Sequence, residues 1–255
     1  MAPDSELEKA KQALHTLARM QTAQGLAALF LERKRPFEHD PHLKALIDQG
    51  LLTPNAFIQK APRLLRFYRR LLFSLAEPPR AIFEIGVKGG GSTAFWKTLF
   101  PAAVVVGLDL KLRWGLASEP SDDGVIYVQG DQTDTAALAG IAKRHGPFDV
   151  VIDDGSHVVE HQVITMRALL PHVRHGGLYV VEDINTGLKE AGTATSVDYG
   201  EDVWADFTAG VIQQLRKGPA MTATPGGALA HDLLPLIDDL IVGHRVLALR
   251  VRERD

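Results

Sequence analysis

The chain has 255 residues, 45% of them hydrophobic and 23% charged, and its 28 Lys and Arg against 31 Asp and Glu leave a formal net charge of -3. This composition is typical of a globular protein with a sizeable core, and it excludes collagen-like, disordered and mini-protein classes. The slightly acidic balance makes nucleic acid a poor partner, and the absence of cysteine excludes thiolate metal sites and thiol nucleophiles. The first residues lack a signal-peptide pattern and no apolar run approaches the ~18–20 residues of a spanning helix, so we expect a cytoplasmic protein with no membrane segment.

The first part of the chain predicts helices only. Apolar residues recur at helical spacing over residues 5–35 with a break at Gly25, over residues 42–49, and over residues 55–76. The stretch Glu-Pro-Pro-Arg at residues 77–80 then interrupts the pattern. We therefore predict an N-terminal helical cap or lid over residues 1–77 and a second domain over residues 78–255.

Beyond residue 80, short apolar runs alternate with helical patterns. The predicted strands are 81–85, 104–109, 125–129, 148–153, 177–182 and 245–250, and the predicted helices are 92–99, 135–145, 160–173 and a further helix around 204–212. Runs that are apolar on both faces suit strands covered by helices, so the alternation predicts a doubly wound α/β fold with a parallel sheet. Ligands of such a sheet bind outside the carboxyl ends of its strands.

The first predicted strand ends in a glycine-rich turn, Glu-Ile-Gly-Val-Lys-Gly-Gly-Gly-Ser at residues 84–92, where the backbone can approach a ligand closely. A dinucleotide is one candidate, because Gly89-x-Gly91-x-x-Ala94 fits the loose fingerprint and Asp109 follows at about the expected 20 residues. This fingerprint should begin directly after the strand, however, and the strand already ends at Gly86, three residues before Gly89. Glu84 favours S-adenosylmethionine instead, because a carboxylate repels a pyrophosphate but attracts the cationic sulfonium and ammonium groups of that cofactor.

The next two strands end in further candidate cofactor residues. Asp109 can accept both hydroxyls of a ribose, while Asp131 and Gln132 can read the amino group and ring nitrogens of adenine, with turn capping as the alternative for Asp131. The complete set of predicted cofactor residues is Glu84, Gly86, Ser92, Asp109, Asp131, Gln132 and Asp153.

The fourth and fifth strands end in a cluster of acids. Residues 150–157 (Val-Val-Ile-Asp-Asp-Gly-Ser-His) bring two carboxylates and an imidazole, and residues 179–183 (Tyr-Val-Val-Glu-Asp) bring two more carboxylates. Four acids beside one cofactor repel one another, and a divalent cation with oxygen ligands, above all Mg²⁺, relieves that repulsion. Because adjacent strand residues point to opposite faces, we assign Asp154 to the metal and Asp153 to the cofactor side or to anchoring the loop.

A different class of function is also encoded nearby. His157-Val-Val-Glu160-His161 matches the H-x-x-E-H pattern of some zinc hydrolases. Against zinc, His157 falls in a loop directly after a strand, so the two imidazoles need not lie one helical turn apart, and the glycine-rich turn would have no role. A zinc hydrolase is kept as the alternative, as is an adenosylmethionine-binding subunit without catalysis.

These motifs together resemble the metal-dependent class I methyltransferases that O-methylate sugars of macrolide antibiotics, a group similar to cephalosporin-hydroxylase-type and rhamnosyl methyltransferase sequences. The resemblance rests on residues 84–92, 130–132, 152–157 and 176–183, and it covers roughly residues 80–185. It implies a Rossmann-like class I fold with a mostly parallel seven-stranded sheet and helices on both faces. It also implies a homo-oligomer and a role in natural product biosynthesis.

The resemblance further implies that Asp154, Glu182 and Asp183 hold Mg²⁺, that the metal binds two neighbouring hydroxyls of a sugar acceptor, and that His157 is the general base. The chemistry agrees, because metal coordination acidifies a hydroxyl and an imidazole with a pKa of about 6.5 can accept its proton. Two points stay open: a catechol-like diol satisfies the same metal geometry, and Asp154 can be the base with His157 in a positioning role. Residues 184–200, small and polar, are expected to form a mobile lid or a surface connection.

Overall fold

The computed structural model describes residue 24 and residues 60–113, 116, 124–185 and 202–252. The chain divides into two compact units, Met1–Asp131 and Gln132–Asp255. The helices predicted over 5–35 and 42–49 and almost all of the predicted 184–200 loop lie outside the described residues, and the predicted boundary at residue 77 stays a prediction. No helix in the described part of the chain is long and apolar enough to span a membrane.

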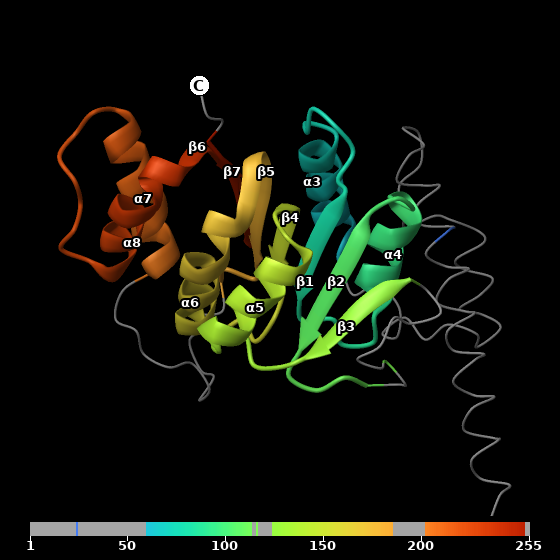
Figure 1. Ribbon diagram of the computed structural model, residues 1–255. Coiled ribbons are helices and arrows are strands. Elements are labelled where there is room, and N and C mark those ends of the chain that lie inside the picture. The colour runs from blue at the N-terminus through green and yellow to red at the C-terminus, as the bar shows by residue number, and fades with distance from the viewer. Residues whose placement is uncertain (1–23, 25–59, 114–115, 117–123, 186–201, 253–255) are drawn as a thin grey trace, which may run out of the picture. The chain divides into compact units, whose positions relative to one another are not determined.

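The first unit contains three parallel strands in the order β3-β2-β1, with β2 pairing to both neighbours (Figure 1). Its described elements are α3 (Pro62–Leu72), β1 (Ala81–Ile85), α4 (Gly91–Leu99), β2 (Val104–Asp109) and β3 (Val125–Gln129). All five residues of β1 are buried, as expected for a strand that is apolar on both faces. The predicted bounds of these three strands are confirmed.

Close packing at Gly107 fixes the glycine-rich turn on the sheet of this unit. A Cβ atom at Gly107 would lie 2.5 Å from Val87 Cγ1 and 3.2 Å from both Thr93 Cγ2 and Tyr127 Cδ1, so only glycine lets Val87 of the turn rest on β2. The hydroxyls of Thr93 and Tyr127 hydrogen-bond to each other at 3.0 Å in the interior. The first turn of α4 is therefore tied to β3, and the turn that precedes α4 is held at the carboxyl ends of the strands.

The second unit has four strands in the order β4-β5-β7-β6, of which β4 and β5 are parallel while β7 is antiparallel to both of its neighbours. Its elements are α5 (Thr135–His145), β4 (Phe148–Asp153), α6 (Val159–Leu169), β5 (Val173–Glu182), α7 (Val203–Leu215), α8 (Pro225–Leu233), β6 (Ile237–Gly243) and β7 (Val246–Val251), with 3₁₀ turns at Leu170–His172 and Leu234–Leu236. Helices α7 and α8 pack against each other (Figure 1). Parallel strands alternate with helices in both units, so the predicted α/β class is confirmed.

Two elements of the second unit differ from the prediction by several residues, β7 differs by one residue at each end, and two more elements are absent from the prediction. Helix α6 ends at Leu169 and β5 already begins at Val173, because Pro171 lacks the N–H that an α-helix would need and leads into a 3₁₀ turn. Strand β6 and helix α8 are not predicted. In β6 the apolar run is interrupted by Asp238 and Asp239. Asp239 pairs with Arg250 of β7, and Asp238 pairs with Arg252, the residue directly after β7, at 3.1 Å each.

Candidate functional site

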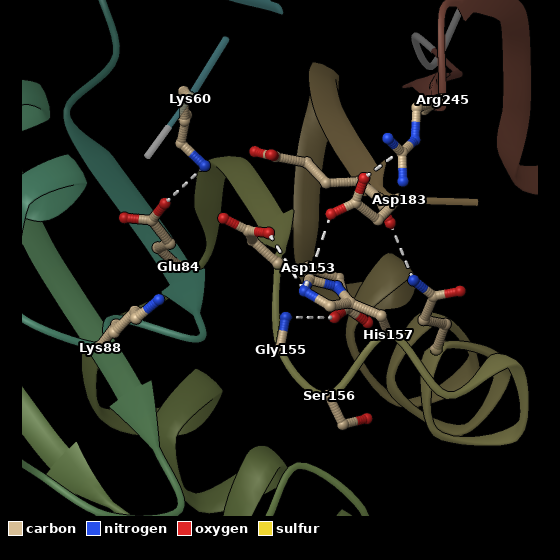
Figure 2. Close-up of polar contacts among 12 residues, drawn as sticks. Lys60, Glu84, Lys88, Asp153, Gly155, Ser156, His157, Asp183 and Arg245 are labelled. Carbon is tan, nitrogen blue, oxygen red and sulfur yellow. Dashed lines mark hydrogen bonds and ion pairs between the residues drawn. The ribbon is translucent and has the colours of Figure 1, made fainter. Parts of the chain in front are cut away.

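The buried acid at the end of β1 is paired with a buried lysine. Glu84 has no exposed side-chain surface, and its Oε1 lies 3.3 Å from Nζ of Lys60, which is itself 6% exposed (Figure 2). The Lys60 ammonium also lies 5.6 Å from the centroid of the Tyr68 ring of α3. The sequence predicts Glu84 as a site residue but not Lys60, because no motif surrounds this lysine.

The turn after β1 takes several left-handed backbone angles. Gly86 and Gly90 have φ of 85° and 71°, which glycine adopts without steric cost, and Lys88 has φ of 49°. Gly90 is the residue before the first turn of α4, and Ser92 is the second residue of that helix and half-buried. The predicted contacts of Gly86 and Ser92 with a cofactor stay predictions.

Asp109, at the end of β2, is oriented by backbone amides of the same unit. Its Oδ2 accepts a hydrogen bond from the Lys88 N–H at 2.8 Å, and its Oδ1 accepts one from the Lys111 N–H at 3.0 Å. Each oxygen keeps acceptor capacity for a ribose hydroxyl. Asp131 is exposed after β3, next to Gly130, whose N–H donates to the Asp109 carbonyl at 2.9 Å.

Gln132 is buried and forms hydrogen bonds with the loop between β4 and α6. Its Oε1 accepts a hydrogen bond from the Ser156 N–H at 2.7 Å, and its Nε2 donates to Asp153 Oδ1 at 3.3 Å and to Thr165 Oγ1 at 3.2 Å. The sequence predicts that Gln132 reads adenine and does not predict these loop contacts. Its role towards adenine stays a prediction.

Asp153, the last residue of β4, anchors the same loop from within. Its Oδ1 also accepts a hydrogen bond from the Gly155 N–H at 3.3 Å, while its Oδ2 has no hydrogen-bond partner among the described residues. Burial raises the pKa of Asp153 to about 7, against the opposing effect of the hydrogen bonds from Gly155 and Gln132. The carboxylate thus contacts the turn that leads to Asp154 and His157, and the predicted role of Asp153 stays a prediction.

Three site residues of the second unit form a candidate metal group. Asp154, His157 and Asp183 each offer one ligand atom, and these atoms lie within 4.8 Å of one another. His157 Nε2 lies 4.0 Å from Asp154 Oδ1 and 3.7 Å from Asp183 Oδ2 (Figure 2). Two hard carboxylate oxygens and an imidazole, all partly accessible to solvent, fit a divalent cation such as Mg²⁺.

Glu182 is not a member of this group, although it directly precedes Asp183. Its side chain is buried, at 3% exposure of the residue, and its backbone carbonyl accepts a hydrogen bond from Gln162 Nε2 at 2.9 Å. Gln162 Oε1 in turn accepts from Trp204 Nε1 at 3.0 Å. A ligand role for Glu182 stays a prediction. The two hydrogen bonds by which Gln162 connects Glu182 with Trp204 are not predicted from the sequence. A signal for it exists, since Gln162 and Thr165 are polar residues on the buried face of α6.

Arg245 lies in the turn between β6 and β7 and contacts Asp183 from a second direction. Its Nε is 3.5 Å from Asp183 Oδ1 and donates a short hydrogen bond to Asn185 Oδ1, and its backbone carbonyl accepts from the Ile184 N–H at 3.2 Å. Figure 2 shows Asp183 with His157 on one side and Arg245 on the other. The sequence places Arg245 at the start of a strand and assigns it no role.

The geometry gives the zinc alternative no support. Helix α6 begins at Val159, so His157 precedes it, while His161 lies in its first turn and hydrogen-bonds through Nδ1 to Ser156 Oγ at 2.9 Å. In the described part of the chain, the candidate metal group contains neither Glu160 nor His161. The two histidines of the motif therefore have different surroundings.

Comparison with known proteins finds similarity to methyltransferases. Residues 83–184 match the Methyltransf_24 family, a methyltransferase domain. The chain is 40% identical over 126 residues to 8-demethyl-8-(2-methoxy-alpha-L-rhamnosyl)-tetracenomycin-C 3'-O-methyltransferase of Streptomyces olivaceus, covering 47% of this chain and 31% of that protein. It is 46% identical over 112 residues to mycinamicin VI 2''-O-methyltransferase of Micromonospora griseorubida, covering 41% of this chain and 27% of that protein.

A solved structure extends the similarity over most of the chain. The MycE methyltransferase from the mycinamycin biosynthetic pathway, in complex with Mg and SAH, superimposes with a TM-score of 0.61 at 31% sequence identity, covering 85% of this chain and 55% of that chain. Residues 83–184 thus lie in a domain with the Rossmann-like fold of class I methyltransferases. The predicted resemblance to sugar O-methyltransferases of antibiotic biosynthesis is confirmed. The chain spans less than a third of the length of these two curated relatives and about half of the solved chain.

Proposed function

We propose that this chain transfers the methyl group of S-adenosylmethionine to a hydroxyl of a vicinal diol, with a sugar of a natural product as the acceptor and Mg²⁺ as the metal. The observation that carries the proposal is the group formed by Asp154, His157 and Asp183 at the ends of β4 and β5. Support also comes from the relatives, which are named as methyltransferases of rhamnosyl-tetracenomycin and of mycinamicin, and from the solved relative that binds Mg and SAH.

The cofactor would be bound by the residues that follow β1, β2 and β3. Glu84 supplies the negative charge that the sulfonium and ammonium groups require, and Asp109, already oriented by two backbone amides, accepts the ribose hydroxyls. Gly86 and Ser92 shape the turn against the ligand. The remaining proposed cofactor contacts are Asp131, Gln132 and Asp153.

The metal would be held by Asp154 and Asp183, with Glu182 as the third acid that the resemblance implies. A divalent cation held there would supply the Lewis acidity that makes a hydroxyl of the vicinal diol a stronger acid. His157 Nε2 accepts the proton of that hydroxyl, and the positive charge then formed on the ring lies beside the carboxylates of Asp154 and Asp183. Asp183 is kept in place by Arg245, which contacts its other oxygen.

The acceptor class rests on the relatives rather than on a pocket of this chain. A catechol-like diol meets the same metal requirement and is the second candidate for the acceptor. The sugar is favoured because the relative from Streptomyces olivaceus is named for a rhamnosyl-bearing tetracenomycin. The cytoplasmic location and the homo-oligomer predicted from the sequence stay predictions.

Calorimetric titration of the full chain with S-adenosylhomocysteine and with NAD, each with Mg²⁺ or with a chelator, tests the proposal. We expect binding of S-adenosylhomocysteine and no binding of NAD, followed by Mg²⁺-dependent methylation in a screen of glycosylated and catechol acceptors. Binding of neither ligand together with stoichiometric uptake of zinc would overturn the proposal in favour of a hydrolase.

A further inference from the structure

Lys60 is a buried cation in an unusual place. Among the described residues it is the one lysine or arginine that is buried, and its ammonium group faces the carboxylate that ends the apolar strand β1 (Figure 2). It lies outside residues 83–184, which match the methyltransferase family, and it directly precedes the residue before α3. No role in the proposed reaction has been assigned to it so far.

Stability alone does not account for this ion pair. Removing two charges from water costs several kcal/mol per ion, and replacing a buried pair by apolar residues is often neutral or stabilising. The neighbours of Glu84 in β1 are Ala81, Ile82, Phe83 and Ile85, all buried and apolar, so a fifth apolar residue would fit the same surroundings. The Lys60–Glu84 ion pair lies at the end of a strand, next to the glycine-rich turn. A buried ion pair at this position indicates a ligand that itself carries charged groups.

The amino acid end of S-adenosylmethionine carries two opposite charges, an ammonium and a carboxylate. Glu84 complements only the ammonium, and a carboxylate bound beside it would need a cation at the same depth. We propose that Lys60 binds the carboxylate of S-adenosylmethionine while Glu84 binds its ammonium, an inference that rests on the proposed function. The buried ion pair is then a receptor for a zwitterion.

This arrangement keeps every buried charge compensated before and after binding. Without ligand, Lys60 Nζ and Glu84 Oε1 face each other at 3.3 Å. With ligand, each side chain exchanges its partner for the opposite charge of the zwitterion, so the net charge of the site does not change. A ligand that has the ammonium but lacks the carboxylate would take Glu84 away from Lys60 and give Lys60 no carboxylate in return. Because an uncompensated buried charge is strongly unfavourable, such a ligand is expected to bind more weakly.

The test compares two ligands that differ only in the carboxylate, with a third that lacks both the amino acid end and the sulfonium charge. S-adenosylmethionine has both charges, decarboxylated S-adenosylmethionine has only the ammonium end group, and 5'-methylthioadenosine has neither. We expect the wild-type chain to bind S-adenosylmethionine about tenfold to a hundredfold more tightly than the decarboxylated ligand, the usual worth of a contact to a charged group. Lys60→Met is expected to abolish this preference, because only the ligand with a carboxylate loses a contact.

A matched lysine serves as the control. Lys97 of α4 lies in the same unit, is part-buried, and donates from Nζ to the Ala103 carbonyl at 2.8 Å. Lys97→Met is expected to keep the wild-type preference between the two ligands. A purely structural role of Lys60 would weaken both ligands alike and leave their ratio unchanged, so the ratio separates the two explanations.

Several outcomes would overturn the proposal. One is a wild-type chain that binds the two ligands equally, and another is a Lys60→Met variant that keeps the preference. If Lys60→Met does not fold, judged by circular dichroism, the double variant Lys60→Met/Glu84→Gln removes both buried charges, and a preference retained there would also overturn it. A wild-type chain that binds none of the adenosyl ligands refutes the proposed function itself, which is a distinct result.

Discussion

Replacing Gln162 by leucine is expected to destabilise the protein and to weaken metal binding. The Gln162 side chain has no exposed surface and joins two elements, since Nε2 donates to the Glu182 carbonyl at the end of β5 and Oε1 accepts from Trp204 Nε1 of α7. Leucine has a similar size but makes neither bond. The change therefore removes polar contacts directly behind the strand end that carries the proposed metal acids.

The magnitude follows from the two hydrogen bonds. Trp204 is 3% exposed and its Nε1–H donates to Gln162 Oε1, so Gln162→Leu leaves a buried donor unsatisfied at a cost of about 1–3 kcal/mol. Loss of the bond to the Glu182 carbonyl adds about 1 kcal/mol, for a total of about 2–4 kcal/mol. For a chain of this size, such a loss lowers Tm by roughly 5–15 °C.

The assay is a double-mutant cycle with Trp204→Phe, which removes the indole N–H and keeps an aromatic ring. We expect the double variant to be less destabilised than the sum of the single variants by about 1–2 kcal/mol in chemical denaturation, because the phenylalanine leaves no donor to satisfy. Calorimetric titration of Gln162→Leu with Mn²⁺ should show weaker binding than in the wild type. If the losses in free energy of unfolding of the two single variants add up in the double variant and the metal affinity of Gln162→Leu is unchanged, Gln162 does not connect Trp204 with the end of β5 through these hydrogen bonds.

The remaining predictions concern the proposed metal and base residues and the proposed cofactor-binding turn. His157→Ala is expected to lower turnover by about 10²–10⁴-fold with little change in affinity for S-adenosylhomocysteine, and unchanged turnover would remove His157 from the role of general base. Asp154→Asn is expected to abolish the stimulation of activity by Mg²⁺, whereas a variant that still responds to Mg²⁺ would argue against Asp154 as a ligand. Gly107→Ala is expected to weaken S-adenosylhomocysteine binding, because the added Cβ would meet Val87 Cγ1 at 2.5 Å and displace the glycine-rich turn. Gly140→Ala is the control, since its nearest neighbour is the end of Arg144 at 3.8 Å, and equal binding by both variants would contradict this account of the turn.

The fold is predictable from the sequence wherever burial is uniform along an element. Strands β1, β2 and β4 have the predicted bounds because most of their residues are apolar and buried, which a covered strand requires. Strand β6 is not predicted because its two aspartates pair with Arg250 of β7 and with Arg252 directly after it, and a sequence does not display these partners of a charged strand. Helix α8 begins Pro-Gly-Gly, a composition that is typical of a turn.

The candidate site also contains residues that a local sequence pattern predicts and residues that depend on a partner distant in sequence. Asp154, His157 and Asp183 are predictable because polar residues directly after apolar strands are exceptions to the local pattern, and parallel strands bring such ends to one edge. Lys60, Gln162 and Arg245 are not predictable in this way. Each acts through a partner that is 20 to 60 residues distant in sequence, so the pairing exists only in the folded chain.

Backbone geometry supports the same assignment without reference to any motif. His157 and Asp183 have φ of 60° and 51°, angles that cost free energy for residues with a Cβ although aspartate and histidine tolerate them better than most. Lys217 has a similar angle, but it follows α7, where a left-handed residue commonly ends a helix. His157 and Asp183 instead follow strands, where glycine would adopt these angles without strain. Glycine at these positions would remove the imidazole and the carboxylate that face each other at 3.7 Å, so the strained angles agree with the roles proposed for these two side chains.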